Sequence, residues 1–196
     1  MQKDSILNII LVGVGLCIVC GAVISTVAVS LRDQQEQNVI FDQQSKIIDA
    51  ARLLEVYPSS QEALASIEEV VVNLNDGQPS SFPPQQYDLD SILRDPSQHT
   101  VLNGSEDIAM ISVRENLSKV FIEYRNNELK TLILPVRGYG LWGTLYGYLA
   151  LDSDLNTIVG LEFYKHKETP GLGAEVDNPN WKKLWNGKKV FDENGL

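Results

Sequence analysis

The sequence predicts an α+β protein in which a single N-terminal transmembrane helix precedes a domain with an antiparallel sheet flanked by helices. Three patterns support this fold class. No charged residue occurs between Asp4 and Arg32. The following stretch places apolar residues at three- and four-residue spacing, which is typical of an amphipathic helix. From Lys119 onward, apolar and polar residues alternate in strand-length runs joined by short turns, which is typical of antiparallel strands.

The uncharged run from Ile6 to Leu31 is long enough to cross a bilayer. As a helix rising about 1.5 Å per residue it would extend roughly 39 Å, and a hydrocarbon core is about 30 Å thick. A cleaved signal peptide is the alternative, because Ala28 and Ser30 are small residues at a cleavage-like spacing. The run is far longer than the roughly 7 to 15 apolar residues of a signal peptide, which favours a retained anchor.

One face of this span carries a small residue at every fourth position, namely Gly13, Cys17, Gly21 and Ser25. Small residues allow a second helix to approach closely, and close packing is a main source of helix pairing in lipid. Small residues are also common in membrane helices that have no partner. We expect membrane helices of other subunits to pack on this stripe.

Cys17 and Cys20 are the only two cysteines of the chain. Two thiols within a helix lack the four ligands of a closed zinc or iron–sulfur site, so we expect them to be packing residues. The orientation of the span is not fixed by charge, because Lys3 on one side is matched by Arg32 and later basic residues on the other.

Two helices are predicted after the span. The first covers "DQQEQNVIFDQQSKIIDAARLLEVY" and ends at Pro58 and Ser59. The second covers "SSQEALASIEEVVVNL", with Ser60 as a candidate cap and Asn75-Asp76-Gly77 at its end. A turn-rich segment, "DGQPSSFPPQQYD", then leads toward the strands.

Four strands are predicted in the second half of the chain. The first begins at Lys119, Asn126-Asn127 forms a turn, and "ELKTLILPV" returns as the second strand of a hairpin. The runs "GTLYGYLALD" and "NTIVGLEFYK" flank the turn "SDLN". Near the end of the chain, Val190-Phe191 followed by Asp-Glu-Asn-Gly resembles a strand that enters a turn.

Composition and motif spacing exclude several classes of function. A formal charge of −10 and a pI near 4.6 argue against binding to a phosphate backbone. Asp152, Asp154 and Asn156 have the spacing that opens a calcium loop, but Thr157 replaces the required glycine. His99 and His166 are too far apart in sequence to suggest a metal pair. We therefore assign no metal ligand and no catalytic residue.

The segment "HKETPGLG", His166 to Gly173, combines a proline with two glycines and offers no nucleophile beside a base. Pro170 fixes its own φ and favours an extended Thr169, while Gly171 and Gly173 permit close approach by a flat ligand. Asn178 and Pro179 then look like the N-cap and first residue of a helix that contains Trp181 and Trp185. A rigid loop of this kind suits a cofactor that brings its own reactivity. A plain strand-to-helix connection is the alternative interpretation.

The segments "LPVRGYGLWGTLYGYLALDSDLNTIVGLEFYKHK" and "ETPGLGAEVDNPNWKKLWNGKKVFDENG" closely resemble the C subunit of the Na+-translocating NADH:quinone reductase. The resemblance extends to the N-terminal anchor and its "LRDQQ…DQQSKI" continuation. "ETPGLG" also occurs in the G subunit of the Rnf complex and in other FMN-binding domains. The reductase is favoured by Gly140-Leu141-Trp142, by Asn178-Pro179-x-Trp181 and by Gly187-Lys188-Lys189.

This resemblance implies a bacterial inner-membrane protein with one span and a soluble domain on the periplasmic side. In that family FMN is joined through its phosphate to a threonine of a Ser-Gly-Ala-Thr run, and the flavin passes single electrons between other subunits. The sequence contains no Ser-Gly-Ala-Thr, so it offers no residue for covalent attachment. By resemblance, the flavin ring would be lined by Trp142, Glu168, Thr169, Pro170, Gly171 and Leu172.

The resemblance further implies a non-catalytic subunit of a sodium-transporting translocase, with the NADH, sodium and ubiquinone sites on other subunits. A G subunit of the Rnf type and a non-redox membrane anchor or assembly subunit are the alternatives. We expect a tail at residues 1–5, the transmembrane helix at 6–31, a helical and loop-rich membrane-proximal part at 32–112, and an incomplete FMN-binding domain at 113–196.

Overall fold

The computed structural model describes residues 6–192 and 195 and comprises two compact units, with the boundary at Asp42 and Gln43. Helix α1, Ile6–Ala50, is one continuous helix of 45 residues and contains the predicted span. By length and composition, it is the one helix of the described part that could cross a membrane. The predicted apolar N-terminal helix is therefore confirmed.

α1 ends at Ala50, before the Pro58 and Ser59 at which the sequence had predicted its end. Arg52 adopts a left-handed conformation with φ of 54°, which breaks the helical path. A short 3₁₀ helix, η1 Leu53–Glu55, follows. The prediction of a longer helix was wrong because the backbone reversal occurs at an arginine, which carries no sequence signal for a turn.

The second predicted helix is divided into a short helix and a strand. Helix α2 covers only Ser60–Ala65, and its N-cap is Ser59, whose hydroxyl accepts a hydrogen bond from the Glu62 amide, and not Ser60. Strand β1, Ile67–Asn73, then pairs antiparallel with β4, Leu117–Arg125, along the whole length of β1. The β-branched run Val70 to Val72 favours a strand, and pairing with β4 outweighs the helix-forming residues beside it.

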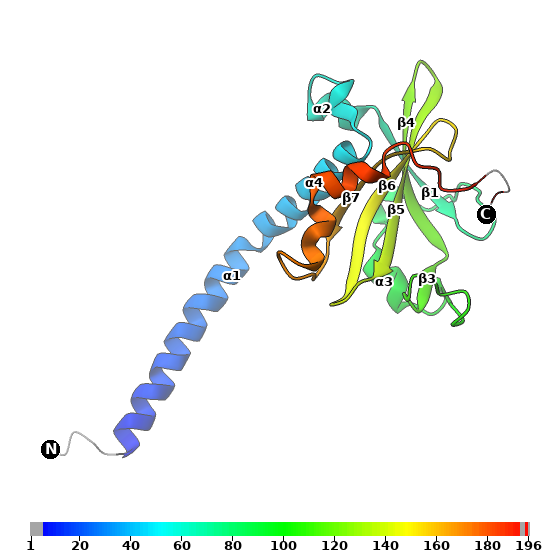
Figure 1. Ribbon diagram of the computed structural model, residues 1–196. Coiled ribbons are helices and arrows are strands. Elements are labelled where there is room, and N and C mark those ends of the chain that lie inside the picture. Colours follow the sequence, from blue (N-terminus) through cyan, green and yellow to red (C-terminus); the bar gives the residue numbers. More distant parts are fainter. Residues whose placement is uncertain (1–5, 193–194, 196) are drawn as a thin grey trace. The chain divides into compact units, whose positions relative to one another are not determined.

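The main sheet has five antiparallel strands in the order β1-β4-β5-β6-β7 (Figure 1). Each of the four predicted strands is present, as β4 Leu117–Arg125, β5 Glu128–Tyr139, β6 Thr144–Asp152 and β7 Ile158–Lys165. Asn126 and Asn127 both have positive φ, at 56° and 61°, as a tight hairpin turn requires. The predicted fold class is confirmed.

Two smaller groups of elements lie between and after these strands. The turn-rich segment contains the 3₁₀ helix η2, Pro84–Gln86. The helix α3, Leu89–Arg94, follows it, and then a separate two-stranded sheet of β2, His99–Val101, and β3, Val113–Glu115. After β7 come η3 Gly173–Asp177, α4 Pro179–Lys182 and η4 Lys183–Trp185. In Figure 1, α3 and β3 lie toward the end of the sheet that carries the β5–β6 turn.

The predicted cap of the C-terminal helix is confirmed, since the Asn178 side chain accepts a hydrogen bond from the Asn180 amide. That helix is split, because Trp181 lies in α4 and Trp185 in η4. The strand predicted at Val190-Phe191 is not formed. The segment instead makes a single bridge, Thr157 with Lys189, and the Val190 amide donates to the Asn156 carbonyl. The turn predicted after it includes residues outside the described ones.

The core lies where the last turns of α1 pack on one face of the sheet. Ile47, Ile48 and Ala50 are buried against sheet residues that include Phe121, Ile133, Tyr148 and Ala150. Gly160 on β7 permits this approach, because a β-carbon there would collide with the Ala50 carbonyl oxygen. Tyr148 and Tyr164 stack beside the cluster with ring centroids 4.9 Å apart, and burial raises the pKa of Tyr164 to about 12.

Glu123 on β4 is a fully buried carboxylate at the edge of this core. Its Oε1 accepts hydrogen bonds from the Tyr57 hydroxyl at 2.9 Å and from the Arg125 guanidinium at 2.8 Å. Its Oε2 accepts one from the Thr131 hydroxyl at 3.0 Å. Glu123 thus joins the segment after α1 to two strands of the sheet, and these three partners stabilise the buried charge.

We predict that Glu123→Ala lowers the free energy of unfolding by about 2–3 kcal/mol, because the Tyr57 and Thr131 hydroxyls lose a charged acceptor. Denaturant unfolding followed by tryptophan fluorescence measures this change. Glu128→Ala is the matched control, since Glu128 pairs with Lys130 at the exposed β4–β5 turn. Equal unfolding midpoints for the two variants would contradict a structural role for the Glu123 network.

Candidate functional site

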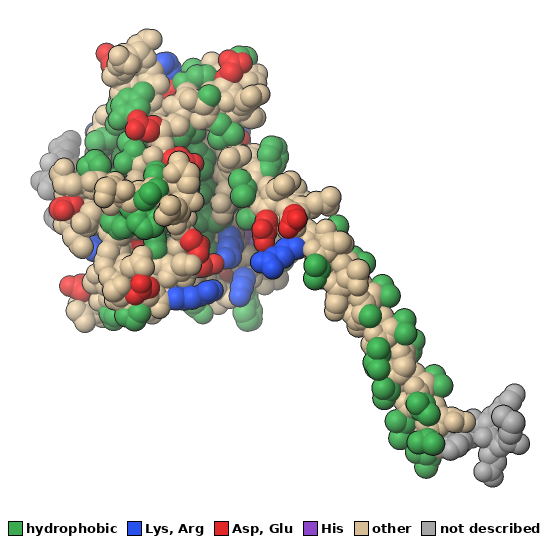
Figure 2. Space-filling model, turned by 180° about the vertical axis from the view of Figure 1, so that it is seen from behind, with side chains coloured by type: hydrophobic (Ala, Val, Ile, Leu, Met, Phe, Trp, Pro, Cys, Tyr) green, Lys and Arg blue, Asp and Glu red, His purple; other side chains and the backbone are tan. Residues whose placement is uncertain are grey.

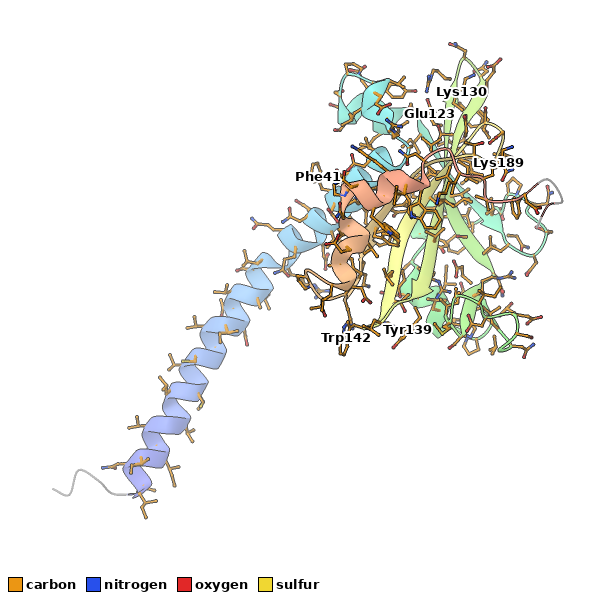
Figure 3. All side chains as sticks on the ribbon, in the orientation of Figure 1. Phe41, Glu123, Lys130, Tyr139, Trp142 and Lys189 are labelled. Atoms are coloured by element: carbon orange, nitrogen blue, oxygen red, sulfur yellow. The ribbon has the colours of Figure 1, made fainter. Side chains whose placement is uncertain are left out.

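Three loops meet at the end of the sheet where β5 turns into β6. They are the β5–β6 turn around residues 139–143, the loop after β7 at residues 166–173, and the segment around residues 107–110. The Tyr139 amide donates a hydrogen bond of 2.8 Å to the Ala109 carbonyl, which ties the first and third loops. Figure 3 shows Tyr139 and Trp142 near each other at this end, with Glu123, Lys130 and Lys189 toward the other.

The Glu168 carboxylate joins the β5–β6 turn to the loop after β7. Glu168 is 8% exposed, and its Oε1 accepts a hydrogen bond of 3.1 Å from the Trp142 amide. Gly140 and Gly173 lie directly against the carboxylate, and a β-carbon at either position would collide with it. The two glycines therefore form a cradle that only residues without a side chain permit.

His166 supports Glu168 from within the same loop. Its Nδ1 accepts a hydrogen bond from the Glu168 amide at 3.1 Å, so in the neutral ring the proton is on Nε2. Nε2 lies 2.7 Å from the Asp177 carboxylate, which accepts that proton as a hydrogen bond. Both ring nitrogens are thus engaged in holding the loop in its conformation.

The remaining predicted site residues lie on the surface around this cradle. Thr169, Pro170, Gly171, Leu172 and Trp142 are all exposed. The Thr169 carbonyl accepts hydrogen bonds from the Leu172 and Ala174 amides, each at 3.1 Å, so the loop forms a compact turn. Gly171 has φ of 75°, and the space beside its α-carbon is open.

The exposed part of this surface is largely apolar. Trp142 and Leu172 offer apolar surface, and the open side of Gly171 leaves room for a flat group. Glu168 differs from the other five predicted residues, because its carboxylate is turned inward to the Trp142 amide. The structure thus brings together all six predicted residues, with Glu168 positioning the loops and the other five on the surface.

A group of ion pairs connects β7, the last turns of α1 and α4. Glu162 on β7 accepts from Lys46 of α1 at 3.4 Å and from Lys182 of α4 at 2.5 Å. The three side chains are between 13% and 27% exposed. Glu162 therefore fixes the helix that follows the loop against both the sheet and the last turns of α1.

Sequence reasoning missed the contribution of residues 107–110. Ile108 is 92% exposed and Met110 is 61% exposed, beside the β5–β6 turn. A pocket of about 460 Å³ adjoins them, lined by Thr100, Leu102, Glu106, Asp107, Ile108, Ala109, Ile111 and Arg114. The segment has no periodicity or motif, so only its proximity to the turn in the fold identifies it.

We predict that Glu168→Ala increases the hydrogen-exchange rate of the Trp142 amide by about tenfold or more, because hydrogen bonds to charged groups contribute about 1.5–3 kcal/mol. Hydrogen exchange read by mass spectrometry on peptides that cover residues 139–145 provides the measurement. Glu175→Ala is the control, since Glu175 is exposed and its carboxylate contacts the neighbouring Asn178. Equal exchange in the two variants would mean that Glu168 does not hold the turn.

Comparisons with known proteins identify the family of the chain. The FMN-binding domain family matches residues 140–195, which contain both the β5–β6 turn and the loop after β7. The C subunit of the Na(+)-translocating NADH-quinone reductase from Pseudomonas aeruginosa is 43% identical, with 99% of this chain and 76% of the relative covered. The corresponding protein from Vibrio vulnificus is 40% identical, over 98% of this chain and 76% of the relative.

Solved structures of proteins from the same family also match the fold of this chain. The crystal structure of NqrC from Shewanella oneidensis matches with a TM-score of 0.70 at 33% identity, and covers 78% of this chain and 71% of that one. The C subunit of the reductase from Parabacteroides distasonis matches with a TM-score of 0.59 at 30% identity, over 82% of this chain and 71% of that one. Sequence and structure together lead to one assignment: the chain belongs to the family of the C subunit of the Na+-translocating NADH:quinone reductase.

Proposed function

We propose that this protein is an electron-transfer subunit of the Na+-translocating NADH:quinone reductase and that it passes electrons through FMN. The observation that carries the proposal is the Glu168 cradle, which holds the Trp142 turn against the "ETPGLG" loop within the region matched by the FMN-binding family. FMN, when bound, supplies the one-electron chemistry. The protein is thus a non-catalytic part of a sodium-transporting translocase.

In this proposal each part of the site has a distinct role. Glu168 fixes the distance between the two loops, and Trp142 and Leu172 cover apolar surface of the ring. Thr169, Pro170 and Gly171 set the loop conformation beside it. No residue of this sequence is assigned the covalent attachment that the family makes through Ser-Gly-Ala-Thr. The residues of the two loops are proposed to contact the flavin ring.

Membership of this family supports a proposal for the location of the protein. We place it in the bacterial inner membrane with α1 as its single span and the sheet domain on the periplasmic side. Residues 113–196 carry the FMN-binding part, and residues 32–112 connect it to the span. The NADH, sodium and ubiquinone sites belong to the partner subunits in this arrangement.

We predict that Gly171→Val weakens FMN binding about tenfold, because a side chain at positive φ costs about 1–2 kcal/mol and displaces the loop. In the test, the full chain is expressed together with the other subunits of the complex, in cells that lack their own C subunit. Flavin content of the purified complex and NADH-dependent quinone reduction are then measured. A complex that reduces quinone at the full rate without flavin in this subunit would overturn the proposed function.

Gly187→Val is the matched control for this experiment. Gly187 also has positive φ, at 78°, and open space beside its α-carbon, but it lies after η4 and outside the loop. Both variants therefore carry the same kind of backbone strain. If both lose the same amount of flavin, the effect comes from strain in the domain and not from the site.

Partner subunits are proposed to pack on the small-residue stripe Gly13, Cys17, Gly21 and Ser25. Gly21→Leu should then reduce the recovery of partner subunits about tenfold without affecting membrane insertion, because it prevents close approach of two helix backbones. Gly15→Leu is the control, since position 15 lies on the opposite side of the helix from the stripe. Co-purification of the complex measures both variants, and equal recovery would exclude the stripe as the contact.

A further inference from the structure

The end of the sheet that carries the Glu168 cradle also presents a group of exposed apolar side chains, here called the apolar tip. Its members come from all three loops and are between 52% and 92% exposed: Ile108, Met110, Tyr139, Leu141, Trp142 and Leu172. The Tyr139–Ala109 and Trp142–Glu168 hydrogen bonds hold these loops together. Exposed apolar surface gathered at one place indicates an interaction site.

The chemistry of the apolar tip is that of a membrane interface. Trp and Tyr side chains with one apolar and one polar end are favoured at the level of the lipid headgroups. Two exposed lysines adjoin the tip. The stem of Lys167 lies along Gly143, and the Lys165 ammonium lies 5.1 Å from the centre of the Tyr146 ring. Lysines of this kind place their stems on apolar surface and their charge among headgroups.

Carboxylates near the apolar tip are mostly engaged within the loops. Asp107 accepts hydrogen bonds from the Ile111 and Ser112 amides at 2.8 and 2.7 Å. Glu106 contacts Asn103 in its own loop, and Glu168 is buried. Figure 2 shows hydrophobic side chains along the lower margin of the domain, together with both basic and acidic side chains. A zwitterionic lipid surface carries no net charge, so the overall charge of −10 does not prevent local contact with it.

The length of the connection keeps the domain within reach of the bilayer. The apolar run ends at Leu31 and the compact domain begins at Gln43. Eleven intervening helical residues span about 16 Å, and a domain of this size has a radius of gyration of about 15 Å. Because the tether makes lipid contact an intramolecular event, weak affinity of the tip for lipid is sufficient.

We propose that the apolar tip docks on the surface of the membrane that α1 spans, with Trp142 and Tyr139 at headgroup depth and Lys165 and Lys167 beside them. This places the loops of the candidate flavin site at the lipid surface. The apolar tip shares Trp142 and Leu172 with the candidate flavin site, whereas Ile108, Met110, Tyr139 and Leu141 are outside the residues assigned to the cofactor.

The test uses the full chain, one copy per nanodisc, in phosphatidylcholine brominated close to the headgroup. Bromine quenches nearby tryptophans, so emission is compared with that in unbrominated discs. Trp142→Phe leaves Trp181 and Trp185 as background. We expect quenching that is lost in Trp142→Phe and that falls about threefold when Ile108 and Met110 are both replaced by Asp, because charges at an apolar interface weaken lipid contact.

Leu155→Asp is the matched control. Leu155 is an exposed leucine in the β6–β7 turn, at the opposite end of β6 from the apolar tip, and it should leave quenching unchanged. Emission from Trp181 and Trp185 reports whether each variant is folded. Absence of quenching in the unmodified chain would overturn the proposal, as would quenching that the Ile108 and Met110 replacements do not change.

Two further measurements distinguish lipid from other ligands of the apolar tip. FMN titration of the Ile108→Asp, Met110→Asp variant should give the affinity of the unmodified chain. A parallel loss of FMN affinity would assign this surface to the cofactor and overturn lipid docking. If bromine fails to quench Trp142 only in discs that hold two copies, the surface instead binds a second chain. Failure of FMN binding with lipid quenching intact would overturn the proposed function alone.

Discussion

The domain depends on the close approach between the last turns of α1 and the sheet. Ile47, Ile48 and Ala50 are buried against strands that lie far later in the sequence. Gly160 allows the contact because its α-carbon lies directly against the Ala50 carbonyl. Burial of these apolar side chains supplies most of the free energy that holds the helix to the strands.

Two carboxylates with little exposure to solvent add further links between α1, the segment after it and the sheet. Glu123 fixes the segment after α1 to β4 and β5, while Glu162 connects Lys46 of α1 to Lys182 of α4. The loop between β7 and α4 therefore has both of its ends attached to the core. That arrangement explains how a loop with two glycines keeps one conformation beside the Trp142 turn.

Much of the fold was predictable because it rests on local patterns. Alternation with the Asn126-Asn127 and "SDLN" turns predicted the β4–β5 and β6–β7 hairpins, and the uncharged run predicted the long helix. The end of α1 at Ala50, before the left-handed Arg52, and the change from α2 to β1 were not predicted. Residues 67–73 pair with β4, which is distant in the chain, and such long-range pairing overrides local helix-forming tendency.

The candidate site was predictable in part for the same reason. Motif resemblance located residues 142 and 168–172, and the fold brings them together. The inward direction of Glu168 depends on Gly140, which belongs to a different loop, and no local pattern connects the two. Ile108 and Met110 were missed because exposed apolar residues in an irregular loop acquire meaning only from their neighbours in space.

The contact at Gly160 also has a genetic consequence. Every missense change in a glycine codon introduces at least a β-carbon, and a β-carbon at this position would meet the Ala50 carbonyl. Any single-nucleotide missense change at this codon therefore requires α1 to move away from the sheet. A compensating change would have to move backbone rather than shorten a side chain, so position 160 has few ways to vary independently of the end of α1.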